Sequence, residues 1–150
     1  MSKSHEYWMA LAIKEAKKAT LEDEIPVAAI AVCNNELIYA EHNKTRQTQN
    51  PLAHAEKLVI DELLKTNKYL YDYTLYITLE PCMMCAGSII LSRVGTVVYG
   101  AKDAKSGVCG SIYNVLQDKR FNHEPKLIKG ILEGECSELL KEFFAHKRNS

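Results

Sequence analysis

The chain has 150 residues, the length of one compact domain, so we expect a single domain over residues 1–150 rather than a multidomain protein. Apolar residues make up 47% and charged residues 25%, a balance that excludes a disordered or fibrous chain. Lys plus Arg and Asp plus Glu number 19 each. The formal net charge is therefore zero, and any polyanionic partner must be recognised locally.

Hydropathy and cysteine usage predict the cellular compartment of the protein. The longest apolar run, Val27–Cys33, is far shorter than the roughly 20 residues that span a bilayer, and charged residues interrupt the first twenty positions. Two of the five cysteines stand in Cys82-Met83-Met84-Cys85, a spacing more typical of metal or redox chemistry than of a secreted disulfide framework. We therefore expect a soluble, cytoplasmic protein with reduced thiols.

The first forty residues predict a helix and a hairpin. Apolar side chains recur every three to four positions from residue 7, which predicts an amphipathic helix to about Thr20 with Ser4 as its N-cap. Two apolar segments, Val27–Cys33 and Glu36–Ala40, flank Asn34-Asn35. Asparagine tolerates positive φ, so this pattern favours a hairpin with a two-residue turn.

The middle of the chain alternates helices and strands. The polar residues 42–51 predict a loop, and Pro51 marks the start of a largely buried helix over Ala53–Leu64 that ends by Asn67. Residues 74–79 predict a strand, Pro81 opens a helix to about residue 92, and residues 96–101 predict a further strand. This order indicates an α/β sheet with helices on both faces.

The last third is less regular. Residues 102–110 predict a loop, Ser111–Leu116 a helical turn, and Ser137–Arg148 a C-terminal helix. The end of that helix is basic, which suits a helix C-terminus and equally suits contact with phosphate.

Two short motifs carry the chemistry: His54-Ala55-Glu56 at one helix start and Glu80-Pro81-Cys82-Met83-Met84-Cys85 at the next. Cys82 and Cys85 are three apart, so they project from one side of a first helical turn, where amide dipoles favour thiolate. If the two helices lie side by side, His54 joins these thiols at one point. The expected ion is Zn²⁺, one per chain.

Glu56 is predicted to be a general base and not a ligand. Positions i and i+2 face different sides of a helix, whereas paired zinc ligands on a helix sit at i and i+4. Three protein ligands are the pattern of catalytic zinc, and structural sites close the tetrahedron with a fourth Cys or His. Zinc lowers the pKa of water to about 7, and a neighbouring carboxylate can move the proton. The site is therefore predicted to be hydrolytic.

The order His-x-Glu followed by Pro-Cys-x-x-Cys is the signature of zinc nucleobase deaminases. Each half alone is common, since Cys-x-x-Cys also occurs in redox and structural sites. Their joint order, with a predicted helix and strand between them, makes coincidence a poor explanation.

The chain resembles the bacterial tRNA-specific adenosine deaminases of the cytidine and deoxycytidylate deaminase superfamily over nearly its whole length. The resemblance is carried by Ser4-His5-Glu6-Tyr7-Trp8-Met9, Glu24-Ile25-Pro26-Val27, Asn43, the His54 motif, the segment 74–87, the segment 100–107, Asn122-His123, Gly130-Ile131-Leu132 and Phe143-Phe144. The later segments distinguish it from deaminases of free cytidine.

The resemblance implies hydrolysis of adenosine to inosine at the wobble position of a tRNA anticodon loop. It implies that His54, Cys82 and Cys85 hold zinc and that Glu56 moves protons. It further implies a three-layer α/β/α fold with a five-stranded mixed sheet, and a homodimer that binds the anticodon stem-loop.

The resemblance also implies two substrate-binding residues. Asn43 matches a residue that hydrogen-bonds the base, and Asp103 matches one that lies against the nucleic-acid backbone beside the target nucleotide. The target base would be splayed out of the loop into the pocket. At Ala28, Leu52 and Glu124 the chain departs from the family pattern, and none of these positions belongs to the predicted zinc set.

Two other functions fit part of this pattern. One is a deaminase of a free base or nucleoside, guanine or cytosine, which shares the zinc chemistry but not the RNA. The other is a non-catalytic, zinc-stabilised RNA-binding module in which Glu56 is incidental. A thiol redox role for Cys82 and Cys85 leaves His54 and Glu56 unexplained.

Overall fold

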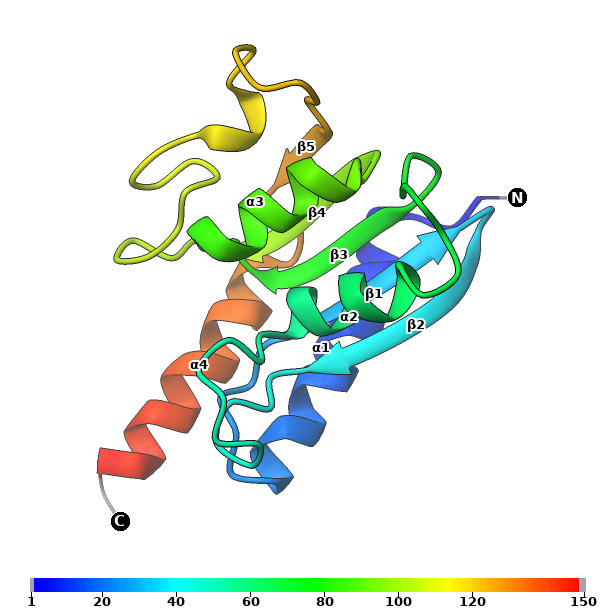
Figure 1. Cartoon of the computed structure of the whole chain (residues 1–150). Coiled ribbons are helices and arrows are strands. Elements are labelled where there is room, and N and C mark those ends of the chain that lie inside the picture. The colour runs from blue at the N-terminus through cyan, green and yellow to red at the C-terminus, as the bar shows by residue number, and fades with distance from the viewer. Residues whose placement is uncertain (1, 149–150) are drawn as a thin grey trace.

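A computed structural model describes residues 2–148 as a five-stranded sheet with two helices on each face (Figure 1). The elements in chain order are α1 (His5–Leu21), β1 (Ala28–Cys33), β2 (Glu36–His42), α2 (Ala55–Leu63), β3 (Thr74–Leu79), α3 (Met83–Ser92), β4 (Thr96–Ala101), the 3₁₀ turn η1 (Val115–Gln117), β5 (Lys126–Lys129) and α4 (Glu133–Arg148). The predicted α/β/α fold is confirmed.

The sheet is mixed, with strand order β2-β1-β3-β4-β5. Strand β1 pairs antiparallel with both β2 and β3, whereas β3, β4 and β5 run parallel. The carboxyl ends of β3 and β4 therefore lie next to each other at one edge of the sheet. Such an edge is the usual place for a ligand site in an α/β protein.

Alternating side chains of the strands build two cores. Ala29 and Ala31 of β1 belong to the apolar cluster that includes α2 and α3, whereas Ile30 and Val32 belong to the cluster that includes α1. Helix α4 packs on the same face as α1, and its Cys136 is buried there. Burial on both faces explains why β1 is an almost continuous apolar run.

Local sequence signals explain most element boundaries. The Ser4 hydroxyl accepts the amide of Tyr7 at 3.0 Å, so Ser4 caps α1 as predicted. Asn34 and Asn35 have φ values of 52° and 59°, which confirms the predicted hairpin turn. The strands over Thr74–Leu79 and Thr96–Ala101 have the predicted bounds.

Several predicted boundaries are wrong. Helix α2 begins at Ala55 and not at Pro51, because the segment between them forms turns. It ends at Leu63, where the Asn67 side chain donates to the Leu63 carbonyl at 3.0 Å. Cys82, and not Pro81, is the N-cap of α3.

The last third also differs from its prediction. The helical turn lies at Val115–Gln117 instead of Ser111–Leu116. Helix α4 begins four residues earlier than predicted, at Glu133. No helix within residues 2–148 has both the length and the apolar character needed to cross a membrane.

Candidate metal centre and deaminase site

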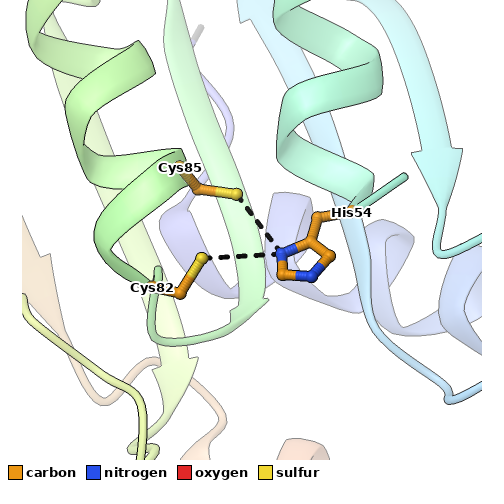
Figure 2. A group of neighbouring side chains, drawn as sticks. All are labelled: His54, Cys82 and Cys85. Atoms are coloured by element: carbon orange, nitrogen blue, oxygen red, sulfur yellow. Dashed lines mark hydrogen bonds between the residues drawn. The ribbon is translucent and has the colours of Figure 1, made fainter. Parts of the chain in front are cut away.

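The two predicted motifs meet at the starts of two neighbouring helices. His54 is the N-cap of α2, Cys82 is the N-cap of α3, and Cys85 lies in the first turn of α3. Helices α2 and α3 lie side by side on one face of the sheet, so these starts face each other (Figure 1). Figure 2 shows the three side chains pointing toward one another.

The distances among the three side chains match a metal site. Nδ1 of His54 lies 3.5 Å from Sγ of Cys82 and 3.6 Å from Sγ of Cys85 (Figure 2). Zinc bonds of about 2.3 Å to sulfur and about 2.0 Å to nitrogen place tetrahedral N and S ligands about 3.6 Å apart. All three ligand atoms lie within 4.8 Å of one another. The donor set therefore fits zinc in both chemistry and spacing.

The electrostatics of the two thiols also point to a cation. Hydrogen bonds from Cys85 and His54 outweigh burial and lower the pKa of Cys82 to about 4. The Cys82 thiolate and burial raise the pKa of Cys85. A second thiolate beside the first therefore needs a positive ion to balance it, which is what zinc supplies to paired cysteines.

Glu56 lies in the first turn of α2 and outside the three-residue metal group found within residues 2–148. Its side chain is buried, and burial raises the pKa of its carboxyl to about 7 against the opposing effects of backbone hydrogen bonding and His54. A carboxyl that titrates near neutral pH can both accept and return a proton. This placement agrees with a base rather than a ligand.

A cavity of about 610 Å³ opens onto these residues. Its lining includes Asn43, His54, Glu56, Cys82 and Asp103, so five of the six predicted site residues surround one space. The sixth, Cys85, is fully buried behind His54 and Cys82.

The two predicted substrate residues also have structural contacts. Oδ1 of Asn43 accepts the amide of Ala55 at 2.8 Å, so this side chain holds the start of α2. Oδ1 of Asp103 accepts the amides of Lys105 and Ser106, each at 3.2 Å, and so shapes its own loop.

Some residues around the cavity were not predicted. Leu140 and Phe144 of α4 form part of the cavity wall. Helix α4 follows the two motifs by about fifty residues, and local sequence patterns do not predict contacts over such a separation. Glu80 also lines the cavity and is 2% exposed. It is the first residue of the second motif, but the sequence predicts no role for Glu80 itself. Cys109 is buried but lies outside the metal group of the described chain.

Comparisons with known proteins agree with this geometry. The family profile of the cytidine and deoxycytidylate deaminase zinc-binding region matches residues 2–101. The tRNA-specific adenosine deaminase of Bacillus subtilis is 49% identical over 145 residues, which cover 95% of this chain and 90% of that protein. The corresponding protein of Aquifex aeolicus is 43% identical over 147 residues, covering 97% of each chain.

Comparison with solved structures supports the same fold, and one of them the same assignment. A structure from a study of A-to-I editing by tRNA:A34 deaminases at the wobble position superposes with a TM-score of 0.83 at 36% identity, covering 89% of this chain and 99% of that one. A guanine deaminase from Nitrosomonas europaea has a TM-score of 0.81 but 21% identity, covering 97% of this chain and 86% of that one, and it shows the fold alone. With its zinc-type ligand group and a buried glutamate beside it, the chain belongs to the tRNA-specific adenosine deaminases, within the zinc-binding cytidine and deoxycytidylate deaminase family.

Proposed function

We propose that this protein is a zinc-dependent hydrolase that deaminates adenosine to inosine at the wobble position of a tRNA anticodon loop. The observation that carries the proposal is the convergence of His54, Cys82 and Cys85 beside the buried Glu56 in one cavity. Relatives of this chain at 49% and 43% identity are named tRNA-specific adenosine deaminases, which supports this substrate over a free base. We also propose that the reaction takes place in the cytoplasm, where a tRNA substrate would be available.

In this proposal His54 binds zinc through Nδ1, and Cys82 and Cys85 bind it as thiolates. When bound, zinc lowers the pKa of water and so makes hydroxide available at neutral pH. Both helix N-termini present amide dipoles to the thiolates, which favours their charged form.

Glu56 is the residue proposed to move protons. Its carboxylate accepts a proton from the water that attacks C6 of adenine and delivers it to the ring nitrogen N1. A further proton transfer through the same carboxyl lets the amino group depart as ammonia. The carbon keeps the water oxygen, so adenosine and water give inosine and ammonia.

Asn43 and Asp103 are proposed to bind the substrate at the cavity. The cavity volume of about 610 Å³ suits a base turned out of an RNA loop, because small-molecule pockets are typically about 300–1,000 Å³. The Asn43 amide can donate from Nδ2 while its Oδ1 holds Ala55. Asp103 lies at the cavity wall, beside the place where the RNA backbone would pass.

We also propose that the protein is a homodimer. Met83 and Leu91, two turns apart on α3, are 68% and 78% exposed. Large apolar side chains on one helix face, left open to water, suit burial against a second copy of the chain. Ile112 and Tyr113, in the segment before η1, are also exposed and add to the apolar area outside the core.

The test is inosine formation in a short RNA anticodon stem-loop that carries adenosine at the wobble position. Zinc-loaded wild type should convert it, zinc-loaded Glu56→Ala should not, and Glu62→Ala, a change on the partly exposed side of the same helix, should match wild type. If zinc-loaded wild type leaves the stem-loop unchanged but deaminates free guanine, cytosine or a nucleoside, the tRNA assignment is wrong. If Glu56→Ala retains full activity, Glu56 does not carry the proton.

A further inference from the structure

We propose that Glu80 is a positioning residue of this site. Its buried carboxylate fixes residues 102–111, whose first five residues line the cavity, against the strand end that leads to the metal ligands. The inference rests on the proposed function for its effect on substrate, but the anchoring of the wall can be measured without any reaction.

The Glu80 carboxylate accepts four hydrogen bonds from the segment that follows β4. Oε1 accepts the amide of Asp103 at 3.0 Å and the hydroxyl of Ser111 at 2.5 Å. Oε2 accepts the amides of Cys109 at 3.0 Å and Ser111 at 2.9 Å. The side chain is 2% exposed, so these bonds are shielded from water. One carboxylate thus ties both ends of the segment to a single point.

Main-chain contacts around Glu80 bring the same two segments together. The Glu80 amide donates to the Ala101 carbonyl at 2.8 Å, and the Val108 amide donates to the Pro81 carbonyl at 3.1 Å. At Gly107 a Cβ atom would overlap the carboxyl group of Glu80 and the carbonyl oxygen of Asp103. Glycine at this position therefore allows the chain to wrap closely around the carboxylate.

The first half of the anchored segment lines the cavity. Residues 102–106 line the cavity, and all of them except Asp103 are exposed to solvent. Exposed loop backbone without such an anchor would sample many conformations, and ordering it on substrate binding would cost affinity. The metal ligands lie beyond Pro81 and are positioned by α2 and α3. Glu80 is therefore expected to act on substrate binding more than on zinc.

Glutamate is required because every partner of this side chain is a donor to it. A carboxylate offers acceptor positions on both oxygens, whereas glutamine replaces one oxygen with an NH₂ group. In either orientation of the amide, that NH₂ group would face backbone N–H groups: Asp103 on one side, or Cys109 and Ser111 on the other. Glu80→Gln thus keeps the size of the side chain and disrupts the anchor.

The experiment compares zinc-loaded wild type with Glu80→Gln, Ser111→Ala and Gly107→Ala. Hydrogen exchange of the amides of residues 102–111 should speed up in all three variants, while exchange in β3 and α3 stays as in wild type. With the anticodon stem-loop, KM should rise about tenfold or more and kcat should change less than about threefold, in line with the loss of a hydrogen bond to a charged group. Zinc content should not change.

Two variants serve as controls. Ser111→Thr keeps a hydroxyl for Glu80 and should restore most of the wild-type KM. Ser92→Ala removes a buried hydroxyl that donates to the Ser88 carbonyl at 2.7 Å, at the far end of α3, and should leave KM unchanged.

The proposal is overturned if exchange in residues 102–111 is unaffected, if Glu80→Gln loses zinc, or if kcat falls while KM holds. Ser111→Ala is the mildest variant, so the test stands even if Glu80→Gln does not fold. An inactive wild type contradicts the tRNA assignment alone, because the exchange measurement decides the anchor without a substrate.

Discussion

Asn43 caps a helix to which it does not belong: its Oδ1 accepts the amide of Ala55, the first residue of α2, at 2.8 Å. His54 occupies the N-cap position of that helix but makes no capping hydrogen bond with its own side chain. Its imidazole faces Cys82 and Cys85 instead. The side chain of Asn43 therefore supplies the cap that His54 cannot, and this leaves His54 free to bind a metal.

Two substitutions of Asn43 separate this cap from base binding. Asn43→Ala removes both functions and should lower the melting temperature by about 2–4 °C, the effect of losing about 1 kcal/mol in a chain of this size. Asn43→Asp keeps an oxygen for Ala55 and should hold the melting temperature near that of wild type. Both variants should lose about tenfold or more in kcat/KM on the stem-loop, because neither offers the amide donor. Full activity of Asn43→Asp would show that this amide does not bind the base.

The sequence predicts the metal ligands of the site but not the start of α2, and the hydrogen bond between Asn43 and Ala55 explains the difference. The types and spacing of His54, Cys82 and Cys85 encode the metal chemistry directly, so the sequence alone predicts this ligand group. The sequence predicts that α2 starts at Pro51, whereas the helix begins at Ala55, because its cap comes from Asn43, twelve residues before Ala55. A cap from a distant side chain leaves no local pattern.

Other features were missed for similar reasons. Strand β5, Lys126–Lys129, is a short edge strand with lysine at both ends, and no periodicity distinguishes it from a loop. The sequence gives no sign that Glu80 is buried and anchored, because three of its four hydrogen-bond donors are backbone amides, 23 to 31 residues away. Almost every residue has a backbone amide, so a hydrogen bond to a backbone amide leaves no recognisable pattern in the sequence.

Removal of the metal should destabilise the protein. A metal held by His54, the N-cap of α2, and by Cys82 and Cys85 at the start of α3 would link the two helices, and its removal leaves the Cys82 thiolate beside the buried Cys85, whose pKa it raises. A strong chelator should lower the melting temperature by several degrees, and added zinc should restore it, since a ligand bound only by the folded state stabilises that state.

The matched variants are Cys82→Ser and Cys33→Ser. Cys82→Ser should bind less than one zinc per chain and melt at a lower temperature, whereas Cys33, half-buried in β1 and away from the group, should tolerate the change. A melting temperature that chelation leaves unchanged, with no zinc released, would argue against a metal at this site.

His42 should make stability depend on pH. Its imidazole is buried between two carboxylates, with Nδ1 2.7 Å from Glu15 and Nε2 2.9 Å from Glu22. Burial alone would lower the pKa of His42, but the hydrogen bonds to Glu22 and Glu15 outweigh it and raise the pKa above its usual value. The two carboxyls in turn have lowered pKa values.

The sign of the effect follows from these shifts. A raised pKa in the folded state means that the His42 contribution is fully present below the unfolded pKa of about 6.5 and is lost as pH rises through the folded pKa. The free energy of unfolding of wild type should therefore exceed that of His42→Gln by more at pH 6 than at pH 9. Denaturant titrations at the two pH values measure this difference. If the difference in the free energy of unfolding between wild type and His42→Gln increases toward alkaline pH, His42 is not charged in the folded state.

The exposed face of α3 should decide the oligomeric state. Leu91→Glu places a charge where the proposed partner subunit would pack, so the variant should sediment as a monomer and the wild type as a dimer. Leu21→Glu is the matched control, because Leu21 is 88% exposed at the end of α1, on the opposite face of the sheet. Equal masses for wild type and Leu91→Glu would exclude this helix from the interface. If Leu21→Glu alone dissociates the dimer, the second copy binds through α1 instead.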